Sequence, residues 1–264
     1  MSDFQSVPHS YLDEYIRQQP YTLQKHLNRV KATDSPEQFG FYVASSAVYS
    51  SRLEGNRIDL DTYWKYRNSG INTSSKLYRE IQDLIRAYEF ARQNDLTQAS
   101  ALTAHSLLSA TIFEEEPQHQ GSIRKQNVNI YAGPTLVYEA ADYTIVQSEV
   151  DKLFADVQVL LTRTLPIDEV FYYAALLHLR IAQIHPFADG NGRVARLVEK
   201  WFLSQQLGNK AWFIQSEFMY YKRQAAYYKN INLAPSYTTL EQRHCLPFLL
   251  MLPGALREKG VYKN

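Results

Sequence analysis

The chain has 264 residues, a length that fits one sizeable domain or one domain with an appendage. Its 28 Lys and Arg residues almost balance its 27 Asp and Glu residues, so the net charge of +1 provides no global field of the kind that a general binder of nucleic acid or acidic membranes uses. Hydrophobic residues make up 45% of the chain, and no low-complexity tract interrupts them, which excludes a mainly disordered protein. We expect a folded protein without a nucleic-acid or membrane partner.

The N-terminal residues show no pattern of a targeting signal. Residues 1–19 lack a basic stretch followed by an apolar one, and no segment reaches the roughly 18 uncharged apolar residues that a membrane span requires. The single cysteine, Cys245, cannot form an intrachain disulfide and is expected to be a small buried side chain. These observations predict a cytoplasmic protein.

Helical patterns follow one another along the chain and predict an all-α fold, since ten glycines and ten prolines supply few turns. The first pattern begins at Ser35 as N-cap, has Pro36 in the first helical position and stops near Gly55. Apolar residues at helical spacing predict further helices over 76–93, from Leu102, from Ser148, over 168–184 with Asp168 as the cap, over 194–207, over 215–231 and over 240–256. We expect His105 and His178, on apolar faces of these helices, to be core histidines.

Residues 121–138 follow a different pattern. Val128 and Ile130 alternate with polar or aromatic neighbours, and Gly133-Pro134 supplies a turn. This pattern predicts a short β-hairpin, which is too small to be an independent sheet.

Residues 185–196, HPFADGNGRVAR, concentrate polar groups and glycines between two apolar helices. Pro186 ends the first helix because the residue before a proline is pushed out of the α region. Gly190 and Gly192 let the backbone approach a ligand closely, and the free N–H groups at the start of the next helix form a natural phosphate cradle.

The charged residues of this segment suit the same ligand. Arg193 and Arg196 lie on one helix face and can clamp phosphate oxygens. Asp189 would be repelled by phosphates unless a cation such as Mg²⁺ bridged them. His185 has the ordinary pKa of a group that can take a proton from an attacking hydroxyl. Together these residue types indicate transfer of a group from a nucleotide.

The segment matches His-x-Phe-x-Asp/Glu-Gly-Asn-Gly-Arg-x-x-Arg at every position and so resembles the signature of the Fic family. The resemblance covers roughly residues 35 to 235 and implies a compact helical Fic-type domain with a short β-hairpin flap. It further implies transfer of AMP from ATP to a Ser, Thr or Tyr hydroxyl of a target protein, with release of pyrophosphate. The implied roles are a general base at His185, a Mg²⁺ ligand at Asp189, an anion hole at Gly190, Asn191 and Gly192, and partners of the leaving phosphates at Arg193 and Arg196.

Other positions also carry the resemblance. Gly192 stands where the phosphoryl-transferring branch of the family has a lysine, which favours AMP transfer. The flap residues Val128, Asn129, Ile130 and Tyr131 are expected to hold the target segment by backbone pairing. A tyrosine pair, Tyr227 and Tyr228, resembles the pair near the family's adenine pocket, and Phe187 is expected to anchor the loop in the core. The implied organisation is an N-terminal extension over 1–34, a Fic-like core over 35–235 and a C-terminal helical tail over 236–264 packed on that core.

The sequence from Ser50 to Asn56 matches the inhibitory motif of some family members, Ser/Thr-x-x-x-Glu-Gly/Asn, and places that motif on the helix over 35–56. A Glu54 carboxylate paired with Arg196 would remove this arginine from the phosphates and add negative charge where they bind. Ser50 lies one turn earlier and could hold the helix end. The alternative is an exposed glutamate before a glycine that ends a helix.

Several interpretations stay open from the sequence. A different nucleotide donor would fit the same motif, because the anion hole binds phosphates and nothing in the motif binds the base. A nucleotide-binding regulatory module is a third interpretation. Self-modification, removal of AMP from a modified target and formation of a homodimer also stay open, as do the target protein and whatever relieves Glu54.

Overall fold

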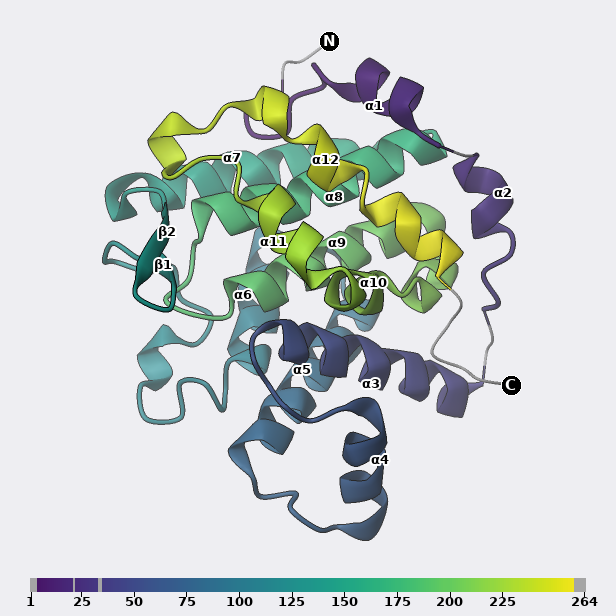
Figure 1. Ribbon diagram of the computed structural model, residues 1–264, viewed down its shortest axis with the longest axis vertical. Helices are drawn as coiled ribbons and strands as arrows, with labels where there is room; N and C mark the ends of the chain where they lie inside the picture. The colour runs from purple at the N-terminus through teal and green to yellow at the C-terminus, as the bar shows by residue number, and fades with distance from the viewer. Residues whose placement is uncertain (1–3, 21, 33–34, 259–264) are drawn as a thin grey trace.

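The computed structural model describes residues 4–20, 22–32 and 35–258, and its regular secondary structure is helical apart from one two-stranded hairpin (Figure 1). The helices are α1 (Leu12–Gln18), α2 (Leu23–Leu27), α3 (Pro36–Leu53), α4 (Leu60–Ser69), α5 (Lys76–Gln93), α6 (Gln98–Leu108), α7 (Tyr143–Leu161), α8 (Ile167–Ile184), α9 (Asn191–Leu207), α10 (Ser216–Lys222), α11 (Gln224–Ile231) and α12 (Leu246–Leu249). The strands are β1 (Asn129–Ala132) and β2 (Thr135–Glu139). The predicted all-α fold with a hairpin is confirmed.

The antiparallel helices α8 and α9 form the centre of the molecule, with α7 and α12 on one side and α3 and α5 on the other (Figure 1). Nearly every side chain of α8 from Val170 to Ile184 is buried, as is typical of a helix that is apolar all round. The connection between α8 and α9 is the segment that carries the motif. The fold therefore holds the motif loop between its two most buried helices.

Side-chain caps set several helix ends. The Ser35 hydroxyl accepts a hydrogen bond from the Gln38 N–H at 3.4 Å, and α3 ends just before Gly55, which adopts a left-handed conformation at φ 89°. Helix α5 spans 76–93, as predicted. The first predicted helix also begins and ends where its cap and glycine indicate.

Several predicted helix bounds are wrong. Helix α8 begins at Ile167 with Pro166 in the N-cap position, so Asp168 lies inside the first turn, where its charge still favours the helix dipole. Helix α7 begins at Tyr143 because the Asp142 carboxylate caps it, five residues before Ser148. Helix α6 begins at Gln98, four residues before the predicted start at Leu102, because the Thr97 hydroxyl caps it. The single helices predicted over 215–231 and 240–256 are instead α10 with α11, and the short α12.

The hairpin turns at Gly133, as predicted, and its strands pair antiparallel with an irregularity between Ile130 and Tyr131. The Tyr138 hydroxyl donates to the Gln183 carbonyl at 2.9 Å and so fixes β2 on the end of α8. At the end of β2, the Glu139 N–H donates to the Pro235 carbonyl at 2.9 Å, which engages part of the outer edge of this strand.

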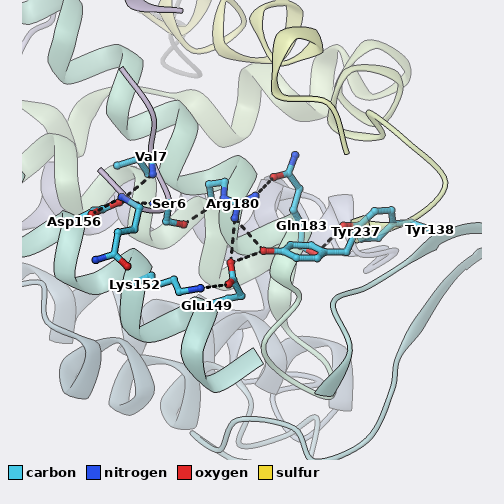
Figure 2. Close-up of polar contacts among 10 residues, drawn as sticks. Ser6, Val7, Tyr138, Glu149, Lys152, Asp156, Arg180, Gln183 and Tyr237 are labelled. Atoms are coloured by element: carbon cyan, nitrogen blue, oxygen red, sulfur yellow. Dashed lines mark hydrogen bonds and ion pairs between the residues drawn. The ribbon is translucent and has the colours of Figure 1, made fainter. Parts of the chain in front are cut away.

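A polar cluster joins the N-terminal arm and the C-terminal segment to the core (Figure 2). The Asp156 carboxylate accepts backbone hydrogen bonds from Ser6 at 2.6 Å and Val7 at 3.0 Å. Arg180 of α8 donates to the Ser6 hydroxyl at 3.3 Å and to the Tyr237 hydroxyl at 3.1 Å. Ser6 of the N-terminal arm and Tyr237 of the C-terminal segment are thereby tied to α8, the helix that leads into the motif loop.

Two predictions from composition concern the molecule as a whole. Across the ranges that the structure describes, no helix combines the length and the apolarity that crossing a membrane would demand. Cys245 is a free, buried cysteine, and burial raises the pKa of its thiol to about 12. Its prediction as a small buried side chain is confirmed.

Candidate active site

The motif loop begins where α8 ends. His185 is the C-cap residue in the left-handed region at φ 55°, and Phe187 is buried in the core, as predicted. The Asn191 side chain accepts from the Phe187 N–H and donates to the Phe187 carbonyl, each at 2.9 Å. This reciprocal pair closes the loop, so the anion hole predicted at Asn191 has only its backbone N–H to offer.

His105 of α6 packs against the motif loop and hydrogen-bonds to its backbone. Its Nδ1 accepts from the Gly121 N–H at 2.9 Å, so the other nitrogen, Nε2, carries the proton and donates to the Asp189 carbonyl at 3.0 Å. The ring stacks on Phe187 with centroids 3.7 Å apart. Burial lowers the pKa of His105 to about 4, which keeps the ring neutral. His105 is a core histidine, as predicted, and it also holds the backbone of the motif loop.

His185 presents one free ring nitrogen. Its Nδ1 lies 3.3 Å from the Ala182 carbonyl, which can only accept, so this nitrogen carries the proton and Nε2 keeps its lone pair. The pKa of His185 is lowered to about 4, chiefly by burial and to a smaller degree by the Arg124 cation, against the opposing effects of the Ala182 carbonyl, Glu54 and Asp189. The imidazole is therefore in the form that accepts a proton at neutral pH.

The start of α9 lies under the Glu54 carboxylate. Gly190 adopts a left-handed conformation at φ 81°, and a Cβ built on Gly192 would lie only 2.3 Å from the Glu54 Oε1. No side chain fits at Gly192 while Glu54 keeps this position. The carboxylate thus occupies space beside the N–H groups that the sequence assigned to an anion.

Arg196 is completely buried and has partners on all three of its nitrogens. Its Nη2 donates to the Glu54 Oε1 at 2.6 Å, its Nε donates to the Ser50 hydroxyl at 2.8 Å, and its Nη1 donates to the Tyr227 hydroxyl at 3.1 Å. Burial raises the pKa of Glu54, but Arg196 and Arg193 outweigh this effect, and the pKa is lowered overall. The pair is therefore ionised at neutral pH.

The other arginine of the motif has a different partner. Arg193 is buried, and its Nη2 lies 3.4 Å from the Glu80 Oε2 of α5. Its Nε has no hydrogen-bond partner within the part of the chain that the structure describes. The two arginines are held by carboxylates of different helices, and only Arg196 contacts α3.

A pocket of about 550 Å³ opens beside His185, Glu54 and Gly192. The flap contributes Ile130 and Tyr131 to its lining. The remaining lining is largely apolar or aromatic and consists of Leu53, Ala132, Val137, Tyr138, Ala182, Gln183, Tyr227, Tyr228, Ile231 and Asn232. A pocket of this size accommodates a small ligand next to the motif loop.

The remaining predicted residues lie around this pocket. Tyr227 is buried against Arg196, whereas Tyr228 is 38% exposed and its hydroxyl donates to the Leu53 carbonyl at 2.5 Å. Asn129 is exposed at the start of β1, and Val128 precedes this strand, where its carbonyl accepts from the Ala140 N–H at 3.3 Å. The fold thus brings the predicted tyrosine pair and flap to the side of the pocket.

Asp189 is exposed at the turn before α9. Within residues 4–20, 22–32 and 35–258, no group of three or more His, Cys, Asp or Glu residues could hold a metal ion by itself. A single exposed carboxylate does fit Mg²⁺ bound together with phosphate, because such a cation takes one or two carboxylates and completes its shell with phosphate oxygens and water.

Helix α3 is attached to the core through a buried ion pair. The Lys200 ammonium of α9 lies 2.5 Å from the Glu217 carboxylate of α10 and donates to the Ser46 hydroxyl at 2.6 Å. The Ser46 hydroxyl also donates to Glu217 at 3.0 Å, and all three residues are buried. The helix that carries Glu54 is therefore an integral part of the fold.

The sequence analysis missed one residue of this region altogether and the second role of another. Arg124 donates to the His185 carbonyl at 2.7 Å, and His105 holds the Asp189 carbonyl. Their partners lie 61 and 84 residues away along the chain, so no local pattern could have assigned these contacts.

Comparisons with known proteins bear on the family and the fold. Residues 95–203 match the family model described as Fic/DOC family. A search of curated proteins finds no match. A Fic family protein from Desulfovibrio desulfuricans G20 has a similar structure, with a TM-score of 0.68 and 24% identity over 94% of this chain and 70% of that one.

Two further solved structures have the same fold. A Fic domain containing signaling protein from Bacteroides thetaiotaomicron VPI-5482 gives a TM-score of 0.64 and 20% identity over 92% of this chain and 93% of that one. A segment of Fic-1 from C. elegans gives a TM-score of 0.60 and 19% identity over 96% and 68%. Residues 95–203 therefore resemble a Fic/DOC family domain, and the chain around them has the fold of these solved Fic structures.

Proposed function

We propose that this protein is an autoinhibited adenylyltransferase that moves AMP from ATP to a Ser, Thr or Tyr hydroxyl of a target protein. The hydroxyl oxygen attacks the α-phosphorus, and its proton passes to the free Nε2 of His185. The bond from the α-phosphorus to the bridging oxygen breaks, and pyrophosphate leaves. The neutral state of His185 supports this role, because only the unprotonated nitrogen can accept the proton.

The start of α9 supports binding of the phosphates. Its backbone N–H groups at Asn191 and Gly192 face an anion with positive partial charge, and Arg196 adds a forked cation once its carboxylate partner moves away. Asp189 would hold Mg²⁺, which neutralises phosphate charge when bound. Gly192 in place of a lysine supports AMP over a phosphoryl group as the transferred unit.

One observation carries the proposed inhibition: the Glu54 Oε1 lies 2.6 Å from the Arg196 Nη2 and 2.3 Å from the position of a Cβ on Gly192. A carboxylate in this place competes with phosphate oxygens for the arginine and repels them from the helix start. Ser50 strengthens the arrangement because its hydroxyl and carbonyl both accept from Arg196. Glu54 is thus the proposed intramolecular brake.

The proposal includes a cytoplasmic setting, where ATP and Mg²⁺ are available, and a protein target held in an extended form beside β1. The flap residues on that strand, from Asn129 to Tyr131, would present the hydroxyl of the target to the pocket. Self-modification and removal of AMP are further activities of the same site, and a homodimer is the proposed alternative to a monomer.

The deciding experiment incubates the wild type, Glu54→Gly and the double variant Glu54→Gly/His185→Ala with Mg²⁺ and ATP, and reads the intact mass for added AMP. We expect a strong adduct in Glu54→Gly, a weak one in the wild type and none in the double variant. Glu114→Gly is the matched control, since it removes the carboxylate of a surface pair with Arg79 outside the pocket and should label like the wild type.

The other outcomes separate the alternatives. Equal labelling of the wild type and Glu54→Gly would remove the brake from the proposal, and labelling of the double variant would remove His185 as the base. Labelling by GTP, CTP or UTP in place of ATP would favour another donor. Nucleotide binding without any adduct, on the protein itself or on proteins of a cell lysate, would favour a regulatory module.

A further inference from the structure

Arg124 is a buried cation, 4% exposed, located just before the hairpin. Within the described residues it forms no ion pair, and every hydrogen bond of its guanidinium goes to a backbone carbonyl. These carbonyls belong to Gln126 at 2.6 Å, His185 at 2.7 Å, Ile184 at 3.3 Å and Ala141. The Arg124 N–H also donates to the Pro186 carbonyl at 3.0 Å.

These partners come from two places. Gln126 and Ala141 flank the hairpin on its two sides, whereas Ile184 and His185 are the last residue and the C-cap of α8. The guanidinium of Arg124 therefore hydrogen-bonds to the backbone on both sides of the hairpin and to the backbone of His185. The carbonyls at the end of α8 bear negative partial charge, which favours a cation at this position.

The bridge acts on the ring of His185 through the backbone. The His185 Nδ1 is held by the Ala182 carbonyl, one turn earlier in α8, and Arg124 fixes the carbonyl of His185 itself. The hairpin is bound to the same guanidinium, so Arg124 links hairpin and imidazole directly, in addition to the hydrogen bond from Tyr138 of β2 to the Gln183 carbonyl of α8. A lysine could not reproduce this bridge, because an ammonium lacks the flat array of five donors.

We propose that Arg124 is a positioning residue that holds the hairpin and His185 in one fixed arrangement, so that a hydroxyl presented at the hairpin lies in reach of the base. The inference rests on the proposed transfer reaction for its consequence, but the mechanical link itself can be measured without any transfer. A displacement of about 1 Å in the reacting groups can lower a rate by about a hundredfold, so a loosened hairpin should act on the rate more than on nucleotide binding.

The experiment compares Arg124→Gln and Arg124→Lys, each combined with Glu54→Gly, with the control Arg180→Gln in the same background. Arg180 is similarly buried, 6% exposed, and lies on α8, but its side-chain partners are Ser6, Glu149, Gln183 and Tyr237, all outside residues 126–141 and the motif loop (Figure 2). Three quantities are measured: amide hydrogen exchange over residues 126–141, the affinity for ATP with Mg²⁺ by calorimetry, and the rate of AMP addition at saturating ATP by intact mass.

We expect Arg124→Gln to raise exchange over 126–141 by tenfold or more and to lower the rate of AMP addition at least tenfold, with ATP affinity changed less than threefold. Arg124→Lys should fall between this variant and the parent. Arg180→Gln should lower the melting temperature comparably but leave exchange over 126–129 and the transfer rate within threefold of the parent.

Exchange over 126–129 that is alike in Arg124→Gln and Arg180→Gln would overturn the inference, as would a loss of ATP affinity as large as the loss of rate. If the Glu54→Gly parent adds no AMP to any protein, the proposed function fails, and the exchange data alone then decide whether Arg124 links hairpin and base. A variant that fails to fold is replaced by Arg124→Lys, for which intermediate exchange supports the link and unchanged exchange refutes it.

Discussion

Helix α3 is held in different ways in its middle and at its C-terminal end. In the middle, Ser46 is bonded to both members of the buried Lys200–Glu217 pair. At the end, the Glu54 side chain is 32% exposed and meets Arg196 at the edge of a pocket. One helix can thus be anchored in the core by its middle and still carry, at its end, a carboxylate that can be displaced. Stability should depend on the middle, and inhibition on the end.

The first prediction concerns the buried ion pair at the middle of α3, where we expect the largest loss of stability. Lys200→Met leaves the Glu217 charge buried without its partner, so the free energy of unfolding should fall by about 3–5 kcal/mol. Urea unfolding followed by circular dichroism measures this change, and the Lys200→Met/Glu217→Leu double variant is the control that should recover much of it. A loss below about 1 kcal/mol would contradict the importance of this pair.

The second prediction concerns the displaceable half. In Glu54→Gly, water in the pocket can replace the carboxylate, so the free energy of unfolding should fall by less than about 1.5 kcal/mol. The affinity for ATP should rise at least tenfold, or about 1.4 kcal/mol, because Arg196 becomes available to phosphate. Calorimetric titration with Mg²⁺ and ATP tests the gain. The ATP affinity of Glu54→Gln, which keeps the size of the side chain, should lie between those of the wild type and Glu54→Gly. Unchanged affinity in both variants would show that Glu54 does not compete with ATP.

The third prediction concerns the pH dependence of stability, which we expect to depend on two histidines at the motif loop and not on α3. The pKa values of His105 and His185 are lowered from 6.5 to about 4, so the unfolded chain binds protons that the folded chain does not as the pH falls from 6.5 to 4. Stability should therefore be fully present above pH 6.5 and decline below it, by up to about 1.4 kcal/mol per pH unit for each histidine. His185→Ala should remove about half of this dependence in unfolding measured between pH 4.5 and 7. An unchanged slope would show that His185 is not held neutral.

The fourth prediction concerns the C-terminal end of α3, where we expect a small loss of stability. Tyr228→Phe removes the hydrogen bond to the Leu53 carbonyl, which fixes the last turn of α3 before Glu54. The free energy of unfolding should fall by about 0.5–1.5 kcal/mol. Self-labelling should rise by less than it does in Glu54→Gly, because the carboxylate keeps its partner. Labelling of Tyr228→Phe at the level of Glu54→Gly would mean that helix position, not the carboxylate, sets inhibition.

Local signals predicted the elements whose ends are set by neighbouring residues. The N-cap of Ser35 and the left-handed glycine at Gly55 enclose α3, and strong apolar spacing sets α5. Helix α4 was missed, although Asp59 caps it and Gly70 ends it, because its surface is largely polar and its apolar spacing is weak. The start of α8 was misplaced because a proline and an aspartate compete for the first turn.

The motif predicted which residues gather at the loop, since they are contiguous in the chain. The motif could not reveal that the Asn191 side chain hydrogen-bonds to the backbone of Phe187, or that Arg193 faces Glu80 of α5. The contact between Glu54 and Arg196 joins residues 142 positions apart and was anticipated only through resemblance to a family motif. Its geometry, with Glu54 directly over Gly192, required the packed structure.

By itself, the sequence determined the helical class, the hairpin and the chemical groups of the motif loop, because each of these depends on residues within one or two turns of one another. Only the tertiary structure decided which carboxylate faces which arginine, that His105 and Arg124 support the loop, and that one nitrogen of His185 stays free. Such contacts depend on how distant helices pack and on the burial that packing creates, and burial is what sets the protonation of the histidines. The site is thus encoded locally in its components and globally in their arrangement.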